Sequence, residues 1–314
     1  MRSASRHREG YVLLLVLLTL AMAGVALAQA ARRVARQSLG VMTAEQELQR
    51  RFGALSCQRV LLPQGEAMIQ HDDAEDTVER LLPRRSARRQ ITLGGIQFTL
   101  LWADEQAKPD INALQQRLGP SKTNQAVDRL ILGERFRAEA RLQPGASHNA
   151  SVEGAFAQEP PDPQRPADDR RYIALDQVFV TASLMAQISA LAHAASSEQA
   201  DPDPPVTCWG KGKLNLHRAT DMALQEWIGD VLDAQQMNEL LDLRREFPGL
   251  GTPALLSQLE LEQKQRAIVM DRLTDHSLCH SLWIVADTEQ RTYCRLAVYF
   301  ESKNHKPQVW SFDW

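Results

Sequence analysis

Residues 10–31 read GYVLLLVLLTLAMAGVALAQAA, and this stretch decides how the chain is organised. Leucine, valine and alanine dominate it, and its one ionisable side chain, the phenol of Tyr11, stays neutral. At 1.5 Å per residue, an α-helix over these residues is roughly 30 Å long, which is the hydrocarbon thickness of a bilayer. The stretch therefore predicts a membrane-spanning helix near the N-terminus.

The helical pattern continues beyond the apolar stretch. Apolar residues recur at spacings near three and four until Pro63 ends the pattern. These residues are Leu39, Met42, Leu48, Phe52 and Leu55. One helix from Tyr11 to Leu62 would be about 75 Å long. We expect its first half to cross a membrane and its second half to pack on a soluble domain.

Two routes of N-terminal processing compete. Residues 26–28 satisfy the small-x-small rule of signal peptidase, and cleavage after Ala28 would release a soluble exported protein. The basic leader instead ends in Gly10, directly before the apolar run, which fits prepilin-type cleavage between Gly10 and Tyr11. That cleavage would leave the helix on the mature chain as an anchor. The long extension of the helix favours this second route, because a secretory signal does not need it.

Charges on both sides of the apolar run bear on orientation. The leader carries Arg2, Arg6, His7 and Arg8, and positive charge marks the cytoplasmic side. Arg32, Arg33 and Arg36 follow the run and weaken this rule. Orientation therefore rests on the large domain that follows the helix.

The composition is typical of a chain that folds around a core, and it does not favour a nucleic-acid-binding protein or a zinc or redox site built on C-x-x-C. With 314 residues, of which 44% are hydrophobic and 24% charged, the chain can bury a core and form two or three compact units. The formal net charge is -3, so no basic excess recruits nucleic acid. The four cysteines lack the C-x-x-C spacing of zinc and redox sites, and their spacing defines no pairing. They are Cys57, Cys208, Cys279 and Cys294.

Two stretches of alternating apolar residues predict an antiparallel sheet. Residues 89–103 alternate on either side of Gly94-Gly95, which predicts a hairpin or a bulge. Residues 282–300 alternate around a turn at Asp287-Thr288-Glu289, and a last strand follows at 309–314. Because the pattern between the two stretches is mainly helical, we expect an α/β domain that contains a helical insert.

The intervening regions add finer expectations. Thr252-Pro253 predicts a helix start with Thr252 as the N-cap. Residues 143–170 and 196–205 are rich in proline and polar side chains and are predicted as loops that bury too little apolar surface to order themselves. Residues 63–87 are predicted to be polar and irregular, and the acidic run within them, residues 71–76, is interpreted as a solvated loop or helix start.

The search for catalytic motifs favours a protein that is not an enzyme. The sequence contains no G-x-S-x-G, H-E-x-x-H, phosphate-binding glycine loop or dinucleotide fingerprint. His276, Cys279 and His280 come nearest to a metal-ligand set, but on a strand Cys279 would face away from both histidines. No metal is therefore assigned. A membrane-tethered hydrolase without a recognised motif is the remaining enzymatic alternative.

Two short segments resemble each other and each opens a helical unit. They are residues 104–112, DEQAKPDIN, and residues 212–219, GKLNLHRA. They resemble the segments D-E-x-G-K-x-N-x-N and G-x-I-N-x-N-T-A of the minor pseudopilin K family of the type II secretion system (general secretion pathway protein K). His217 and Arg218 stand where this family favours Asn and Thr. The leader, the chain length and the position of the insert are similar to the family as well.

The resemblance implies a fold class and a division of the chain. The fold class is α/β and pilin-like: a long N-terminal transmembrane helix, an antiparallel sheet, and a large all-α insert of helix-hairpin or SAM-like type. The expected parts are a prepilin-type leader at 1–10, a transmembrane and amphipathic helix at 11–62, the first part of the α/β domain at 63–109, the inserted helical domain at 110–272, and the final strands at 273–314.

The resemblance also implies a function, partners and a location. It implies a structural and assembly subunit at the tip of the pseudopilus that serves export of folded proteins across the outer membrane. Expected partners are the I and J minor pseudopilins, the major pseudopilin and the prepilin peptidase, with no nucleic acid. The chain would cross the inner membrane once, with its N-terminus cytoplasmic and its bulk periplasmic, and would be processed and methylated. Calcium is bound in this family; Asp287 and Glu289 could contact it here, but no ligand set is assigned. The alternative is a soluble periplasmic adaptor released after Ala28.

Position 15 carries an implication of its own. Most pilin-like proteins have Glu as the fifth residue after the cleavage site, and its carboxylate is thought to pair with the N-terminal amine of a neighbouring subunit. Counted from Tyr11, the fifth residue here is Leu15. An unpaired carboxylate is costly in hydrocarbon, so a subunit that lacks it needs no subunit above it. Leu15 therefore predicts placement at the tip, where the K family is placed.

Overall fold

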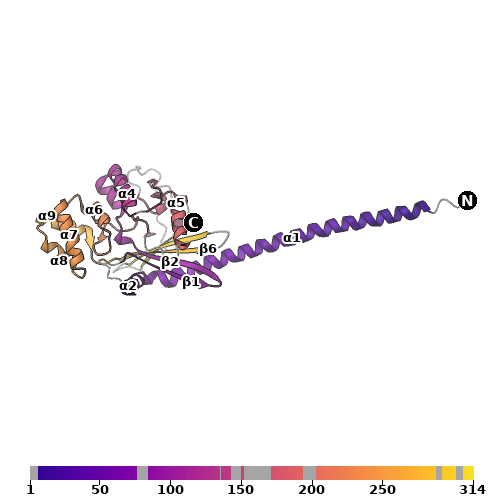
Figure 1. The fold of residues 1–314 in the computed structure, drawn as a ribbon, viewed down its shortest axis with the longest axis horizontal. Helices are drawn as coiled ribbons and strands as arrows, with labels where there is room; N and C mark the ends of the chain where they lie inside the picture. Colours follow the sequence, from indigo (N-terminus) through magenta and orange to yellow (C-terminus); the bar gives the residue numbers. More distant parts are fainter. Residues whose placement is uncertain are drawn as a thin grey trace. The chain divides into compact units, whose positions relative to one another are not determined.

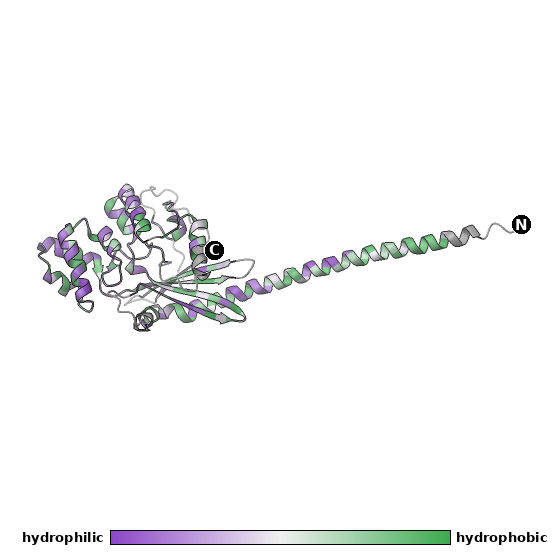
Figure 2. Cartoon of the chain, viewed as in Figure 1, coloured by the Kyte–Doolittle hydropathy of each residue, from purple (hydrophilic) through white to green (hydrophobic). Residues whose placement is uncertain are grey.

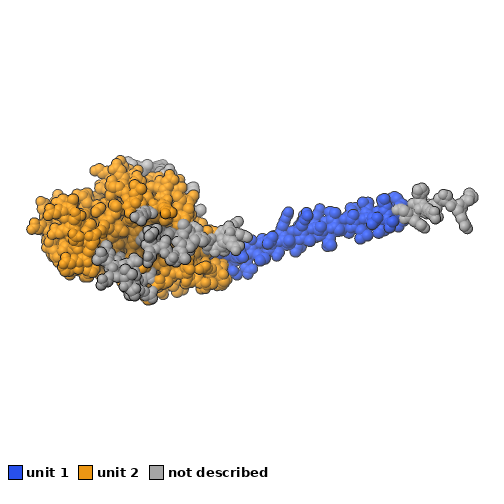
Figure 3. Space-filling view, viewed as in Figure 1, with its two compact units in different colours: residues 1–52 blue, residues 53–314 orange. Residues whose placement is uncertain are grey.

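A computed structural model of the protein describes residues 6–75, 84–134, 136–142, 150–151, 171–193, 203–287, 292–301 and 307–314. The chain forms two units, Met1–Phe52 and Gly53–Trp314, which are coloured separately in Figure 3. The predicted loops at 143–170 and 196–205 lie mostly outside the described residues.

The first unit is built by helix α1 (Arg6–Leu61), whose last residues belong to the second unit. The predicted helix is confirmed: it ends at Leu61, one residue before the expected Leu62, and begins inside the leader at Arg6. By length and composition, this is the one helical segment of the described chain that could cross a membrane, and none of its most apolar window is buried. Figure 2 shows the apolar run along α1 in green.

The second unit is organised around one antiparallel sheet with strand order β1-β2-β6-β7-β8-β3. Its strands are β1 (Ser86–Leu93), β2 (Ile96–Asp104), β6 (Cys279–Asp287), β7 (Thr292–Phe300), β8 (Gln308–Asp313) and the short β3 (Ala150–Ser151). The hairpin predicted at Gly94-Gly95 is confirmed, and both glycines have positive φ values, 58° and 80°, which suit a tight hairpin turn. The predicted turn at Asp287-Thr288-Glu289 lies outside the described residues beyond Asp287.

Strands β2 and β6 are neighbours in the sheet although a long stretch of sequence separates them. Phe98 pairs with Ala286, and Leu100 pairs with Ile284. Val298 on β7 pairs with Ser281 on β6. The strands that the sequence predicted therefore belong to one sheet, which an insert between them requires.

The described residues between β2 and β6 are mainly helical. The helices are α3 (Ile111–Leu118), α4 (Pro120–Gly133), α5 (Thr181–His193), α6 (Asp221–Ile228), α7 (Ala234–Glu246), α8 (Thr252–Gln258) and α9 (Gln263–Arg272), as labelled in part in Figure 1. A two-residue parallel pair, β4 (Leu214–Asn215) with β5 (Leu273–Thr274), joins the start and the end of the last four helices. The sequence did not predict this pair. The boundary of the insert at 110–272 stays a prediction.

The sheet separates two hydrophobic cores. Alternate residues of β6 point to opposite faces, so Leu282 and Ile284 join one core while Trp283 and Val285 join the other. The first core also contains the end of α1, through Ala54 and Cys57, and the residues Leu62 and Ile69. The second contains the apolar faces of the inserted helices. Each face of the sheet is therefore covered by a different part of the chain.

Several local expectations were wrong. Residues 63–87 are not irregular throughout, because a 3-10 turn (Leu62–Gln64) and helix α2 (Gly65–Glu75) precede β1. Burial of Leu62 and Ile69 under the sheet stabilises these elements. Thr252 is not an N-cap: Gly251 takes that position, and the backbone N–H and hydroxyl of Thr252 both donate to the carboxylate of Asp275. The second predicted loop is ordered at its end, where Asp203 is buried.

Candidate functional site

The three residues singled out for processing and placement all lie on α1. Gly10 is inside the helix, and Tyr11 and Leu15 are one turn apart on one face, with 67% and 45% of their surfaces exposed. This part of α1 is a regular helix, and the side chains of Tyr11 and Leu15 are exposed on its surface. Cleavage between Gly10 and Tyr11 and tip placement through Leu15 stay predictions.

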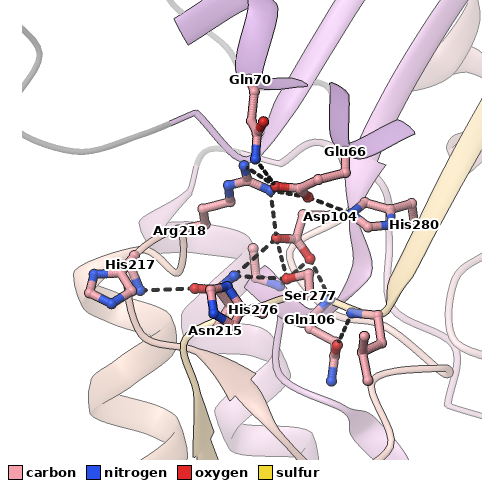
Figure 4. Close-up of polar contacts among 12 residues, drawn as sticks. Glu66, Gln70, Asp104, Gln106, Asn215, His217, Arg218, His276, Ser277 and His280 are labelled. Atoms are coloured by element: carbon pink, nitrogen blue, oxygen red, sulfur yellow. Dashed lines mark hydrogen bonds and ion pairs between the residues drawn. The ribbon is translucent and has the colours of Figure 1, made fainter. Parts of the chain in front are cut away.

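The two similar sequence segments meet in the second unit. The backbone N–H of Gly212 donates to Asp110 Oδ2 at 3.1 Å, and Asn215 Nδ2 donates to Asp104 Oδ2 at 3.4 Å. Figure 4 shows polar side chains around the contact between Asn215 and Asp104, and we call six of them the polar junction. The polar junction consists of Glu66, Asp104, Asn215, Arg218, Ser277 and His280.

Asp104 is the centre of the polar junction. It ends β2 and is fully buried. Its Oδ1 accepts hydrogen bonds from the backbone N–H groups of Gln106, at 2.9 Å, and Ala107, at 3.2 Å, and so caps the turn that follows. Its Oδ2 accepts from Ser277 Oγ at 2.6 Å and from Arg218 at 3.4 Å. Because both oxygens have donors, the carboxylate can be buried without an orphaned lone pair.

Arg218 and His280 converge on Glu66 from two different segments. The guanidinium of Arg218 holds Glu66 through two parallel hydrogen bonds of 2.7 and 2.8 Å, and His280 Nε2 lies 2.8 Å from Glu66 Oε2. Burial raises the pKa of Glu66, but the hydrogen bonds from His280 and Arg218 outweigh burial and lower this pKa to about 2. The carboxylate of Glu66 is therefore ionised at neutral pH.

A buried charged triad lies next to the polar junction. Lys108 Nζ donates to Glu105 Oε1 and to Asp203 Oδ1, both at 2.7 Å, and at most 1% of each of the three side chains is exposed. Ser281 on β6 also donates to Glu105. Burial lowers the pKa of Lys108, but attraction to Asp203 and Glu105 outweighs burial, and the net shift is upward. The triad fixes Asp203 against the end of β2.

The two clusters connect different elements of the second unit, because their polar side chains contact charged side chains from other segments. Ser277 donates to Asp104, Ser281 donates to Glu105, and His280 contacts Glu66. Among the described residues, neither serine hydroxyl has the histidine partner that would activate it as a nucleophile. The arrangement joins α2, the sheet and the segment before α6.

The residues considered for a metal are not brought together. His276 precedes β6, which begins at Cys279, so the strand alternation expected for His276 does not apply. His280 is paired with Glu66, and burial raises the pKa of the Cys279 thiol well above its usual value. In the described residues, no group of three His, Cys, Asp or Glu side chains could hold a metal ion. The four cysteines are buried and free.

Sequence reasoning found one half of the polar junction and missed the other. It singled out residues 104–112 and 212–219, and it marked Arg218 as unusual. It missed Glu66 because nothing in the local pattern of residues 63–87 distinguishes this carboxylate from its acidic neighbours. It missed Asp203 because a proline-rich acidic stretch is typical of a solvated loop.

The described residues combine a long N-terminal helix, whose first part is apolar, with a domain built on an antiparallel sheet. Among solved structures, the chain is similar to a chain in the crystal structure of the GspK–GspI–GspJ complex of the enterotoxigenic Escherichia coli type 2 secretion system. The two chains share 12% sequence identity with a TM-score of 0.48, over 87% of this chain and 99% of that chain. No family model and no curated protein matches the sequence.

Proposed function

We propose that this chain is a minor pseudopilin of a type II secretion system, a membrane-anchored structural and assembly subunit without enzymatic activity. One observation carries the proposal: α1 runs from Arg6 to Leu61, so the apolar segment and the residues that pack under the sheet belong to one helix. Signal peptidase cleavage after Ala28 would cut this helix in its middle. Prepilin-type cleavage between Gly10 and Tyr11 would keep it whole.

The proposed mechanism is assembly. The apolar part of α1 anchors the chain in the inner membrane, with the N-terminus cytoplasmic and the second unit periplasmic. The second unit docks on the I and J minor pseudopilins, beneath which the major pseudopilin is added. Methylation of the new N-terminus would follow cleavage by the prepilin peptidase. The polar junction serves this role by fixing the second unit as one rigid docking body.

N-terminal sequencing of the chain from the membrane fraction tests the anchoring. We expect a mature chain that begins at Tyr11, and we expect Gly10→Leu to leave the full-length precursor in the membrane. Gly24→Leu is the matched control, because it makes the same change inside the helix at a site with no neighbouring atom within 4 Å. A soluble chain that begins at Gln29 would defeat the proposal and establish the soluble periplasmic adaptor, which residues 26–28 favour.

Placement at the tip rests on Leu15. Because Leu15 offers no carboxylate to an N-terminal amine above it, the subunit should cap the filament and not repeat along it. Crosslinking in purified filaments should find about one copy of this chain at one end, beside two other minor subunits. Leu15→Glu should bring no gain in assembly, because the added carboxyl has no partner above it. Many copies along the filament would contradict the role of Leu15.

A further inference from the structure

Three arginines follow directly on the apolar segment of α1. Arg32, Arg33 and Arg36 are exposed, and at 100° per residue they lie within one face of the helix. In the described part of the chain, none of the three forms an ion pair or a side-chain hydrogen bond. The proposed anchoring gives these arginines no function. It places them on the side opposite the cytoplasm, whereas basic residues are usually enriched on the cytoplasmic side.

We call the surface formed by Arg32, Arg33 and Arg36 the arginine face. The sequence supplies no nearby negative charge to neutralise it. The acidic residues that flank it on α1 are Glu9 and Glu45. Glu45 is about 14 Å beyond Arg36 along the helix, which exceeds the screening length of about 8 Å at physiological ionic strength. The arginine face is therefore a local positive charge that lacks an internal partner on its own helix.

The height of the arginine face matches the phosphate layer of a bilayer. Measured from Tyr11, Arg32 lies about 31 Å and Arg36 about 37 Å along the helix axis. The hydrocarbon layer is about 30 Å thick, and the headgroup layer adds several Å on each side. If the apolar run fills the hydrocarbon layer, the three guanidinium groups lie among the lipid headgroups.

We propose that Arg32, Arg33 and Arg36 bind the phosphate groups of anionic phospholipids in the leaflet that faces the second unit. A guanidinium group holds a phosphate through two parallel hydrogen bonds. Binding would fix how deeply α1 sits in the bilayer and would oppose its withdrawal from the membrane. The inference rests on the membrane anchoring of the proposed function.

The test uses the full-length chain in nanodiscs of mixed phosphatidylcholine and phosphatidylglycerol. Native mass spectrometry after release from the discs counts the lipids of each kind that stay bound. The variant replaces Arg32, Arg33 and Arg36 by Gln. The control replaces the exposed Arg59, Arg137 and Lys264 by Gln, which removes the same charge outside the apolar segment. The arginines of the leader are unchanged in both.

We expect the natural chain and the control to retain phosphatidylglycerol in preference to phosphatidylcholine. One arginine at a charged membrane surface changes this preference roughly fivefold, so the triple variant should lose at least tenfold. An equal preference in the variant and the control would overturn the inference.

Flotation with neutral phosphatidylcholine vesicles separates this inference from the proposed function. A chain that fails to float with these vesicles is not anchored, and the proposed function fails with it. A chain that floats in every variant, but shows no loss of lipid preference when the arginines are replaced, remains an anchored subunit. In that case only the lipid-binding inference fails.

Discussion

Replacing Lys108 by Met probes the buried triad most directly. Met keeps most of the length of the side chain but removes its charge and its three donors. Glu105 and Asp203 would lose the ammonium group that lies 2.7 Å from each of them. Both carboxylates are almost completely buried, so water cannot replace the lost partner without opening the structure.

The expected loss of stability follows from this geometry. Removing one partner of a buried ion pair costs about 3–5 kcal/mol, because the remaining charge stays desolvated. The loss should shrink in acid, since a carboxyl left without its partner has a raised pKa in the folded state and is less costly when protonated. The destabilisation is therefore largest above the raised folded-state pKa of these carboxyl groups. It shrinks as pH falls through that pKa towards about 4, the usual pKa of the unfolded carboxyl groups.

Urea unfolding of the full-length chain in detergent, followed by tryptophan fluorescence, measures this loss. All tryptophans lie in residues 102–314, so the signal reports on the second unit. Lys264→Met is the matched control, because Lys264 is exposed, and it should change the free energy of unfolding by less than about 0.5 kcal/mol. A loss below about 1 kcal/mol for Lys108→Met at pH 7 would refute the reasoning.

Two further predictions use the same unfolding assay. Glu66→Gln should destabilise the second unit at neutral pH, and its difference from the natural chain should vanish as pH falls from about 4.3 towards about 2, because a lowered folded-state pKa stabilises only above that range. A difference that is constant over this range would contradict the role of the Glu66 carboxylate. Gly53→Ala should cost about 1–3 kcal/mol despite the higher helix propensity of Ala, because its Cβ would lie 2.4 Å from Phe98 Cζ in the core. Gly40→Ala, with no neighbour within 4 Å, is the control; an equal effect of both changes would exclude the clash.

The sequence predicted those elements whose signal is local. The apolar run and the spacing of apolar residues up to Pro63 define α1, because both patterns follow the helical period over neighbouring residues. Two adjacent glycines define the hairpin between β1 and β2, since the tight turn requires positive φ values. Alternation alone defined β6 and β7. These features depend on neighbours within a few residues.

The features that the sequence did not predict depend on distant partners. The start of α8 looked like a Thr cap because Thr252 suits that role locally, but Asp275, which directly follows β5, supplies the acceptor. The pair β4 with β5 consists of two residues on each strand, which is too short for any alternation to be visible. The acidic stretch before Pro204 looked solvated, but Lys108 holds Asp203 in the interior. In each case a single long-range contact outweighs the local propensity.

Arg218 departs from the pseudopilin K pattern, and the polar junction gives this departure a physical meaning. The pattern favours Thr, whose side chain ends one atom beyond Cβ and could not reach two carboxylates at once. Arg218 contacts Glu66 through both terminal nitrogens and also lies 3.4 Å from Asp104. The buried carboxylate of Asp104 thereby gains a positive partner, and Glu66 binds the same guanidinium group. Arg218 therefore links the two carboxylates, and each carboxylate keeps a further polar partner, which is His280 for Glu66 and Ser277 for Asp104.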